Sequence, residues 1–157
     1  MTKVPSISAA RPDEKFSVLI VQAPYYRHIA TQLLEGAKSR LAAAGCDVEV
    51  VSVPGALEIP GVISIAYEFG DYDGFVALGC VIRGETTHYE IVSGESARGL
   101  MNLNIDGACI GNGILTVENE QQALARANVS DMNKGAGAAE ACLAMMQFRL
   151  DLESRHD

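Results

Sequence analysis

The chain has 157 residues, of which 48% are hydrophobic and 20% charged, and its net charge is −8. This length suits one domain with a sizeable core, and the hydrophobic content argues against a disordered chain. The acidic balance argues against nucleic acid or an anionic membrane as a partner, so an anionic substrate needs a local group of cations. No apolar run approaches the roughly 20 residues of a membrane span, and residues 1–15 lack the apolar core of a signal peptide.

The cysteines are widely spaced along the chain, at Cys46, Cys80, Cys109 and Cys142. No two of them have the CxxC spacing typical of a zinc site, so no metal is expected. Cys80 and Cys109 lie in apolar runs, where cysteine usually acts as a small buried hydrophobic residue. We therefore expect structural thiols in a cytoplasmic protein, and no cofactor.

The first elements in chain order are an arm, a strand and a helix. Residues 1–15 combine prolines with small polar and charged residues, which predicts a flexible N-terminal arm before a single domain at 16–157. The apolar run FSVLIVQA predicts a buried strand at 16–23. Apolar residues then recur every four positions from Ile29 to Leu41, which predicts a helix that ends at Gly45.

The remaining chain alternates between the two patterns. Strands are predicted at 47–53, 75–82 and 108–117, and helices at 59–69, 89–103, 118–127 and 134–153. This alternation predicts an α/β fold with three α/β/α layers around a four-stranded parallel sheet, of the flavodoxin-like type.

Two packing details are expected within these elements. Gly111 and Gly113 interrupt the fourth strand, which indicates a bulge or a close approach of another backbone. The last helix is expected to carry one apolar face, which consists of Ala138, Ala141, Cys142, Met145, Phe148 and Leu152.

A polar turn follows the third predicted strand at 83–88. In an open parallel sheet, ligands bind beyond the carboxyl ends of the strands. This turn can aim backbone N–H groups and two hydroxyls at an anion. His88 lies inside it and can transfer protons near neutral pH. The alternative is an ordinary turn with a capping threonine and an incidental histidine.

Further polar and aromatic residues follow the other strands. Tyr25 can stack on a planar ligand or be an ordinary surface tyrosine. Glu58 can bind a ligand or cap its helix. Arg126 and Lys134 flank the loop before the last helix and offer cations to a phosphate. The alternatives are charge complementation of a helix C-terminus for Arg126 and a solvated side chain for Lys134.

Four motifs carry a resemblance to a known family. They are VPGALEIP at 53–60, LGCVIRGETTHY at 78–89, GILTVEN at 113–119 and NKG at 133–135. In this order and spacing, over about residues 16–150, the chain resembles the 6,7-dimethyl-8-ribityllumazine synthase family.

The resemblance implies a transferase of riboflavin biosynthesis. Its reaction condenses 5-amino-6-(ribitylamino)uracil with 3,4-dihydroxy-2-butanone 4-phosphate to give 6,7-dimethyl-8-ribityllumazine, phosphate and water. The implied course is imine formation, loss of phosphate, then ring closure and dehydration, without a metal or redox cofactor. The alternative is a flavin- or lumazine-binding, or cage-forming, paralogue with little catalytic activity.

The resemblance also implies the roles of the site residues. His88 transfers protons, and Lys134 supports the site. The pyrimidine and ribityl groups are contacted by Tyr25, Ala56, Leu57, Glu58, Val81, Ile82 and Asn112. The phosphate is contacted by Gly84, Glu85, Thr86 and Arg126.

The chain departs from the family pattern at three places, and the family also implies an assembly. Tyr25-Tyr26 replaces the more frequent Phe-Asn, Asn112 stands where many members have Phe, and Gly137 replaces a common acidic residue. Family sites lie between adjacent subunits of a pentamer, which implies that Asn112 and Arg126 complete a neighbour's site. Decamers and 60-subunit shells also occur in the family, and riboflavin synthase is a further candidate partner.

Overall fold

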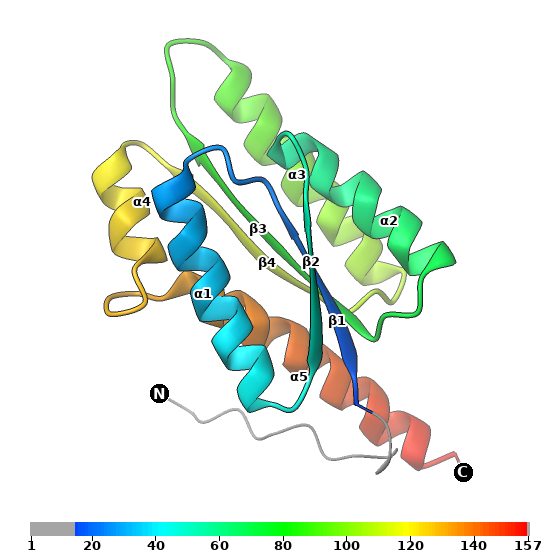
Figure 1. Ribbon diagram of the computed structural model, residues 1–157. Coiled ribbons are helices and arrows are strands. Elements are labelled where there is room, and N and C mark those ends of the chain that lie inside the picture. Colours follow the sequence, from blue (N-terminus) through cyan, green and yellow to red (C-terminus); the bar gives the residue numbers. More distant parts are fainter. Residues whose placement is uncertain (1–14, 157) are drawn as a thin grey trace.

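The computed structural model describes residues 15–156. The arm expected at 1–15 therefore lies outside the described residues, apart from its last position. The described chain forms one parallel sheet with helices on both of its faces (Figure 1).

The sheet has four strands, β1 (Ser17–Gln22), β2 (Asp47–Ser52), β3 (Gly74–Ile82) and β4 (Ile110–Val117). Their order is β2-β1-β3-β4, and every pair is parallel. The carboxyl ends of all four strands therefore lie at the same end of the sheet, where the polar turns follow them. The predicted four-stranded parallel sheet is confirmed.

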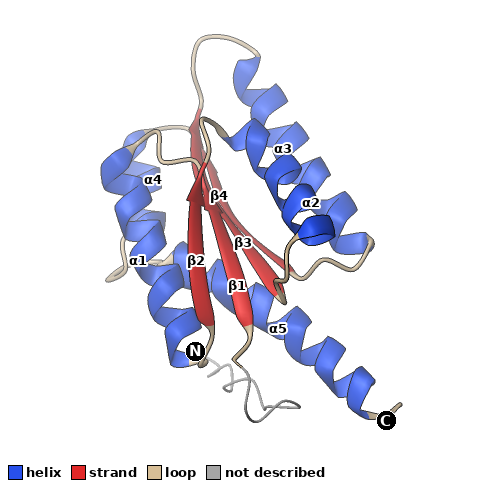
Figure 2. Ribbon diagram, turned by 45° about the vertical axis from the view of Figure 1, so that its right-hand side comes forward, coloured by secondary structure: helices blue, strands red, loops and turns tan. Residues whose placement is uncertain are grey.

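The helices form two layers (Figure 2). One face is covered by α1 (Arg27–Ala43), α4 (Glu120–Ala127) and α5 (Lys134–Ser154). The other face is covered by α2 (Ile59–Phe69) and α3 (His88–Ile105), with a short 3-10 turn, η1 (Ala56–Glu58), before α2. The three-layer prediction is confirmed. None of the described helices has the length and apolar character needed to cross a membrane.

The strand pattern explains why helices are needed on both faces. Val18 and Ile20 point to the α1/α5 side, and Leu19 and Val21 point to the α2/α3 side. All four are at most 3% exposed. Because successive side chains of a strand alternate between faces, a strand that is apolar throughout must be covered on both of them.

The two glycines of β4 mark a close approach and not a bulge. A Cβ at Gly111 would lie 1.7 Å from the Ala138 carbonyl oxygen of α5, and one at Gly113 would lie 2.7 Å from a Leu78 methyl. The pairing register with β3 runs through both glycines without a break. The glycines therefore let α5 lie directly on the strand.

The expectation that these apolar residues of α5 share one face is partly wrong. Cys142 is fully buried, but Phe148 is 66% exposed and Leu152 is 39% exposed. Six positions along a helix of 3.6 residues per turn rotate Phe148 about 240° away from Cys142. The structure instead buries Leu143, Met146 and Leu150.

Met145, Phe148 and Leu152 form a second apolar stripe, which we call the α5 outer stripe. It lines a cleft of about 670 Å³.

Candidate active site

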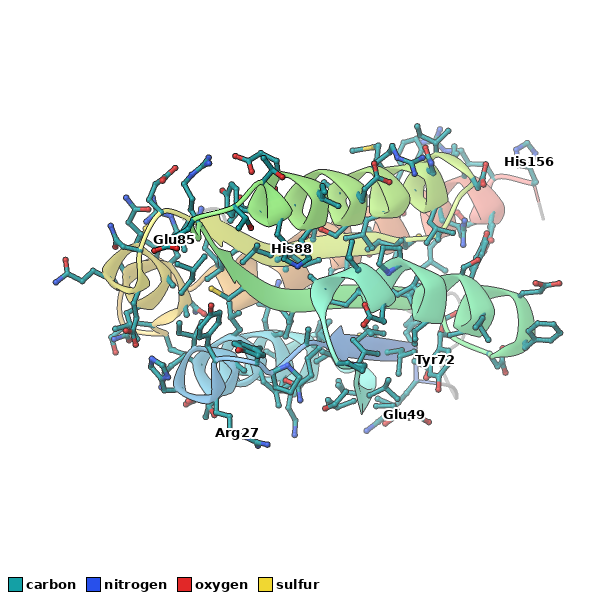
Figure 3. The ribbon with its side chains drawn as sticks, turned by 90° about the horizontal axis from the view of Figure 1, so that it is seen from above. Arg27, Glu49, Tyr72, Glu85, His88 and His156 are labelled. Carbon is teal, nitrogen blue, oxygen red and sulfur yellow. The ribbon has the colours of Figure 1, made fainter. Side chains whose placement is uncertain are left out.

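The turn after β3 is open to solvent along its whole length. Residues 84–87 and His88 are exposed, and His88 is the first residue of α3. The N-cap residue, Thr87, makes no side-chain capping bond, whereas the Thr86 hydroxyl accepts a hydrogen bond from the His88 N–H at 3.3 Å. The turn arches beyond the sheet (Figure 1). In Figure 3, Glu85 lies toward the end of the molecule opposite His156, and His88 lies between the two.

The ends of β1 and β2 contribute an aromatic ring and a carboxylate. Tyr25 is 77% exposed and meets Tyr26 edge to face, with ring centroids 5.0 Å apart, so one face of its ring is open. Glu58 is exposed at the N-cap of α2 and makes no side-chain capping bond, which leaves its carboxylate free for a ligand. Ala56 is buried beneath it, and Leu57 is 43% exposed.

These residues belong to one end of the sheet. The η1 turn contacts both β3 and α3, and Val81 and Ile82 are the partly buried last residues of β3. We call this set the β3-end group. Its members are Tyr25, Ala56, Leu57, Glu58, Val81, Ile82, Gly84, Glu85, Thr86 and His88.

The remaining predicted residues lie along the free edge of β4. Asn112, Arg126 and Lys134 all line one cleft of about 420 Å³, and we call them the β4-edge group. No member of the β3-end group is in the lining of this cleft. The expected site residues thus fall into two groups, and of the two only the β4-edge group lines this cleft.

The β4-edge group combines two cations with an amide. Arg126 donates from Nη1 to the Gln122 carbonyl at 3.1 Å, which agrees with a role at the C-terminus of α4 and leaves its other N–H groups available. Lys134 is exposed at the first position of α5. The Asn112 Oδ1 accepts from the Ile114 N–H at 2.9 Å, so its NH₂ group is the part that can reach a ligand.

Local backbone packing explains where Lys134 lies. Asn133 adopts a left-handed conformation with φ of 48°, and its Oδ1 accepts from the Ala136 N–H at 3.4 Å, which starts α5. A Cβ at Gly135 would lie 2.1 Å from the Leu33 carbonyl oxygen, so α1 and α5 meet at this glycine. The Asn-Lys-Gly turn thus fixes the start of the helix that carries Lys134.

The cysteine thiols are structural in character. All four are free, and burial raises the pKa of Cys46 and of Cys80 to about 11. Burial also raises the pKa of Cys109 and of Cys142. These thiols stay protonated at neutral pH and are poor nucleophiles there. Across residues 15–156, no three His, Cys, Asp or Glu side chains are grouped so as to hold a metal ion.

Two histidines lie outside the β3-end group, and one of them is paired. The His28 Nε2 lies 2.6 Å from the Glu120 Oε1, which links α1 to α4, while His156 is exposed. The sequence analysis assigns no site role to Arg83, yet its guanidinium contacts Glu90, Glu118 and the Tyr89 ring. A basic residue at a strand end, followed by a glutamate in the first turn of the next helix, is the signal that points to it.

Fold and site together define a class: a small parallel α/β protein with an exposed polar turn and a histidine after one strand, and a cleft at the sheet edge that is lined by Arg126 and Lys134. Comparison with known proteins gives the family. The model of the 6,7-dimethyl-8-ribityllumazine synthase family matches residues 15–149, so the chain belongs to that family.

Similar curated proteins carry the same name. The 6,7-dimethyl-8-ribityllumazine synthase of Novosphingobium aromaticivorans is 60% identical over 131 residues, which are 83% of this chain and 94% of that protein. The synthase of Zymomonas mobilis is 57% identical over 134 residues, 85% of this chain and 96% of that protein. The synthase of Sphingopyxis alaskensis is 57% identical over 132 residues, 84% of this chain and 94% of that protein.

Proposed function

We propose that the chain is a transferase of riboflavin biosynthesis that condenses 5-amino-6-(ribitylamino)uracil with 3,4-dihydroxy-2-butanone 4-phosphate. The products are 6,7-dimethyl-8-ribityllumazine, phosphate and water. The observation that carries this proposal is the 60% identity to a protein of that name over 94% of its length. Holding two reactants together supplies much of the rate in such a condensation.

The open positions of the β3-end group support a role for each member. The exposed ring of Tyr25 stacks on the pyrimidine, beside Val81 and Ile82. The free carboxylate of Glu58 accepts hydrogen bonds from ribityl hydroxyls, next to Ala56 and Leu57.

The exposed turn before α3 suits the phosphorylated substrate. Gly84, Glu85 and Thr86 hold the phosphate at the N-terminus of α3, where backbone N–H groups favour an anion. His88 starts that helix, beside the turn. It moves a proton between the substrate carbon that loses one and the departing phosphate.

The β4-edge group supplies the rest of the site from a neighbouring subunit. Arg126 pairs with the phosphate, Lys134 supports the same pocket, and Asn112 faces the pyrimidine. The support for this arrangement is that none of the β3-end residues lines the cleft that holds the β4-edge group.

The assembly that we propose is a pentamer, from which decamers or 60-subunit shells can be built. An exposed apolar face on α2 and α3 supports it, with Ile65, Phe69, Ile91, Met101 and Ile105 each at least half exposed. The α5 outer stripe is a second such face. Two different faces that pack against each other from copy to copy generate a ring when the rotation between copies closes, and the proposed pentamer is such a ring. Ring formation brings the β4-edge group of one copy to the β3-end group of the next.

We place the enzyme in the cytoplasm, with riboflavin synthase as the partner that takes its product. Four free cysteines, all buried or half-buried, support a reducing compartment. The chemistry requires no metal or redox cofactor.

An assay with both substrates tests the proposed function. The purified protein is expected to form the lumazine, which is followed by its absorbance, without added metal. Binding of a lumazine or flavin with no turnover would support the non-catalytic paralogue instead. Activity that a chelator abolishes and a divalent metal restores would contradict the cofactor-free chemistry.

A further inference from the structure

The turn between β3 and α3 has few contacts of its own. Residues 84–87 are exposed. Within the described part of the chain, Thr86 is the one residue of this turn whose side chain makes a hydrogen bond. Its hydroxyl accepts from the His88 N–H. The Arg83 N–H donates to the Val117 carbonyl at 2.9 Å and continues the β3–β4 pairing up to the turn. The shape of the turn therefore depends on what holds its two ends.

The Arg83 guanidinium joins these ends to a third element. Its Nη1 donates to the Glu90 Oε1 at 2.5 Å, and its Nε lies 2.9 Å from the Glu118 Oε2. Its central carbon lies 4.4 Å from the centroid of the Tyr89 ring. Tyr89 and Glu90 are in the first turn of α3, directly after His88, and Glu118 follows β4. One planar cation thus links the end of β3, the start of α3 and the end of β4.

We propose that Arg83 is a positioning residue, which holds residues 84–87 and His88 in the geometry that engages the phosphorylated substrate. This inference rests on the proposed function, because it gives Arg83 a part in the site of that reaction. An exposed single ion pair contributes little. A guanidinium held by two carboxylates and stacked on a ring is fixed in one orientation, which an ammonium group cannot reproduce.

Direct contact between Arg83 and the phosphate is the competing role. Arg83 carries one positive charge, and Glu90 and Glu118 together carry two negative charges. The three side chains therefore have a net charge of −1, which disfavours an anion beside them. Arg126 differs, because its guanidinium donates to a neutral carbonyl of its own helix and keeps its charge for a ligand.

Steady-state kinetics on four variants, R83Q, E90Q, E118Q and R83Q/E90Q, test the proposal. R83Q is expected to lower kcat/KM for the phosphorylated substrate by about ten- to a hundredfold, the effect of a small misplacement of reacting groups. E90Q and E118Q should each lower it less, and R83Q/E90Q should be no worse than R83Q. Amide hydrogen exchange over residues 84–90 should be faster in R83Q than in the unsubstituted protein.

Arg98→Gln is the matched control, because it breaks an exposed Arg98–Glu95 ion pair of 2.6 Å on the same helix. It should leave kcat/KM within about twofold and the exchange over residues 84–90 unchanged. If R83Q does not assemble, the E90Q/E118Q double variant carries the same test.

Two results would overturn the positioning role. One is native kcat/KM and native exchange in R83Q. The other is a lower KM for the phosphorylated substrate in E90Q and E118Q together with a higher KM in R83Q, because freed guanidinium would then be binding the anion directly. An unsubstituted protein that makes no lumazine would reject the proposed function instead, and the exchange measurement would still decide whether Arg83 holds the turn.

Discussion

Tyr25, Glu58 and His88 are exposed in the single chain, so neighbouring groups decide what each of them can do. His88 is at the start of α3, where backbone N–H groups favour an anion beside it. Tyr25 has an open ring face, and Asn112 offers its NH₂ group because its Oδ1 is already bonded to the strand. Because its oxygen is already hydrogen-bonded, the Asn112 side chain has its NH₂ group left to offer to a ligand.

Replacing His88 by Ala should lower kcat by about ten- to a hundredfold, because a positioned acid–base group is lost while proximity of the two reactants is kept. The KM values should change less, and the assembly should be intact. Steady-state kinetics across pH provide the measurement. His28→Ala is the control, since His28 pairs with Glu120 outside both site groups. Native kcat with an unchanged pH profile would make His88 a simple helix-start residue.

Replacing Arg126 by Ala should weaken binding of the phosphorylated substrate by about ten- to a hundredfold, since a charge-assisted hydrogen bond contributes about 1.5–3 kcal/mol. The pyrimidine substrate should be affected much less. Calorimetric titration with each substrate separately measures both affinities. Equal losses for the two substrates would contradict the phosphate role.

Elements place these residues through close backbone contacts. The site helix α5 lies against β4 at Gly111 and against α1 at Gly135, where an added Cβ would overlap a carbonyl oxygen. Gly137, two positions further along α5, has open space around its Cβ position. Gly135 and Gly137 thus belong to the same helix, but Gly135 packs against backbone and Gly137 has open space.

Gly135→Ala should lower the free energy of unfolding by about 1–3 kcal/mol, because its Cβ forces α1 and α5 apart. Gly137→Ala is the matched control and should raise it by roughly 0.5–1 kcal/mol, as alanine is favoured over glycine in a helix. Urea unfolding at one protein concentration compares them. Equal stability of the two variants would mean that the α1–α5 contact is not tight.

The sequence predicted the elements well and their outer faces poorly. The helix predicted at 59–69 was correct to the residue, because Pro60 starts it and a Gly-Asp turn ends it. The outward position of Phe148 was missed, because apolar residues that cover a partner follow the same pattern as those that cover a core. Arg83 was missed because its carboxylate partner after β4, Glu118, lies 35 positions away in the sequence.

At the scale of the whole molecule, the buried thiols should make stability fall in alkaline solution. Burial raises the pKa of Cys46 and of Cys80 from 9.0 to about 11. The folded chain keeps protons that the unfolded chain releases above about pH 9, so this part of the free energy of unfolding is complete below pH 9 and is lost towards pH 11.

Urea unfolding at several pH values between about 8 and 11 should show this loss, at a fixed protein concentration because assembly adds to stability. Tyrosine and lysine side chains also titrate here, so Cys80→Ala is the informative comparison. Its free energy of unfolding should fall less steeply with pH than that of the unsubstituted chain. The same slope in both proteins would contradict the buried-thiol explanation.

In the pentamer that we propose, the β4-edge group of one copy completes the β3-end group of the next. The exposed α2/α3 face and the α5 outer stripe are the surfaces that we propose for the contacts between copies. The most direct test co-refolds the His88→Ala and Arg126→Ala variants together and measures lumazine formation at a concentration of the phosphorylated substrate well below its KM, where each variant alone has little activity. Random mixing in equal amounts should restore about a quarter of native activity, since a complete site needs one intact half from each of two neighbours. Activity no higher than the mean of the two separate variants would contradict a site shared between subunits.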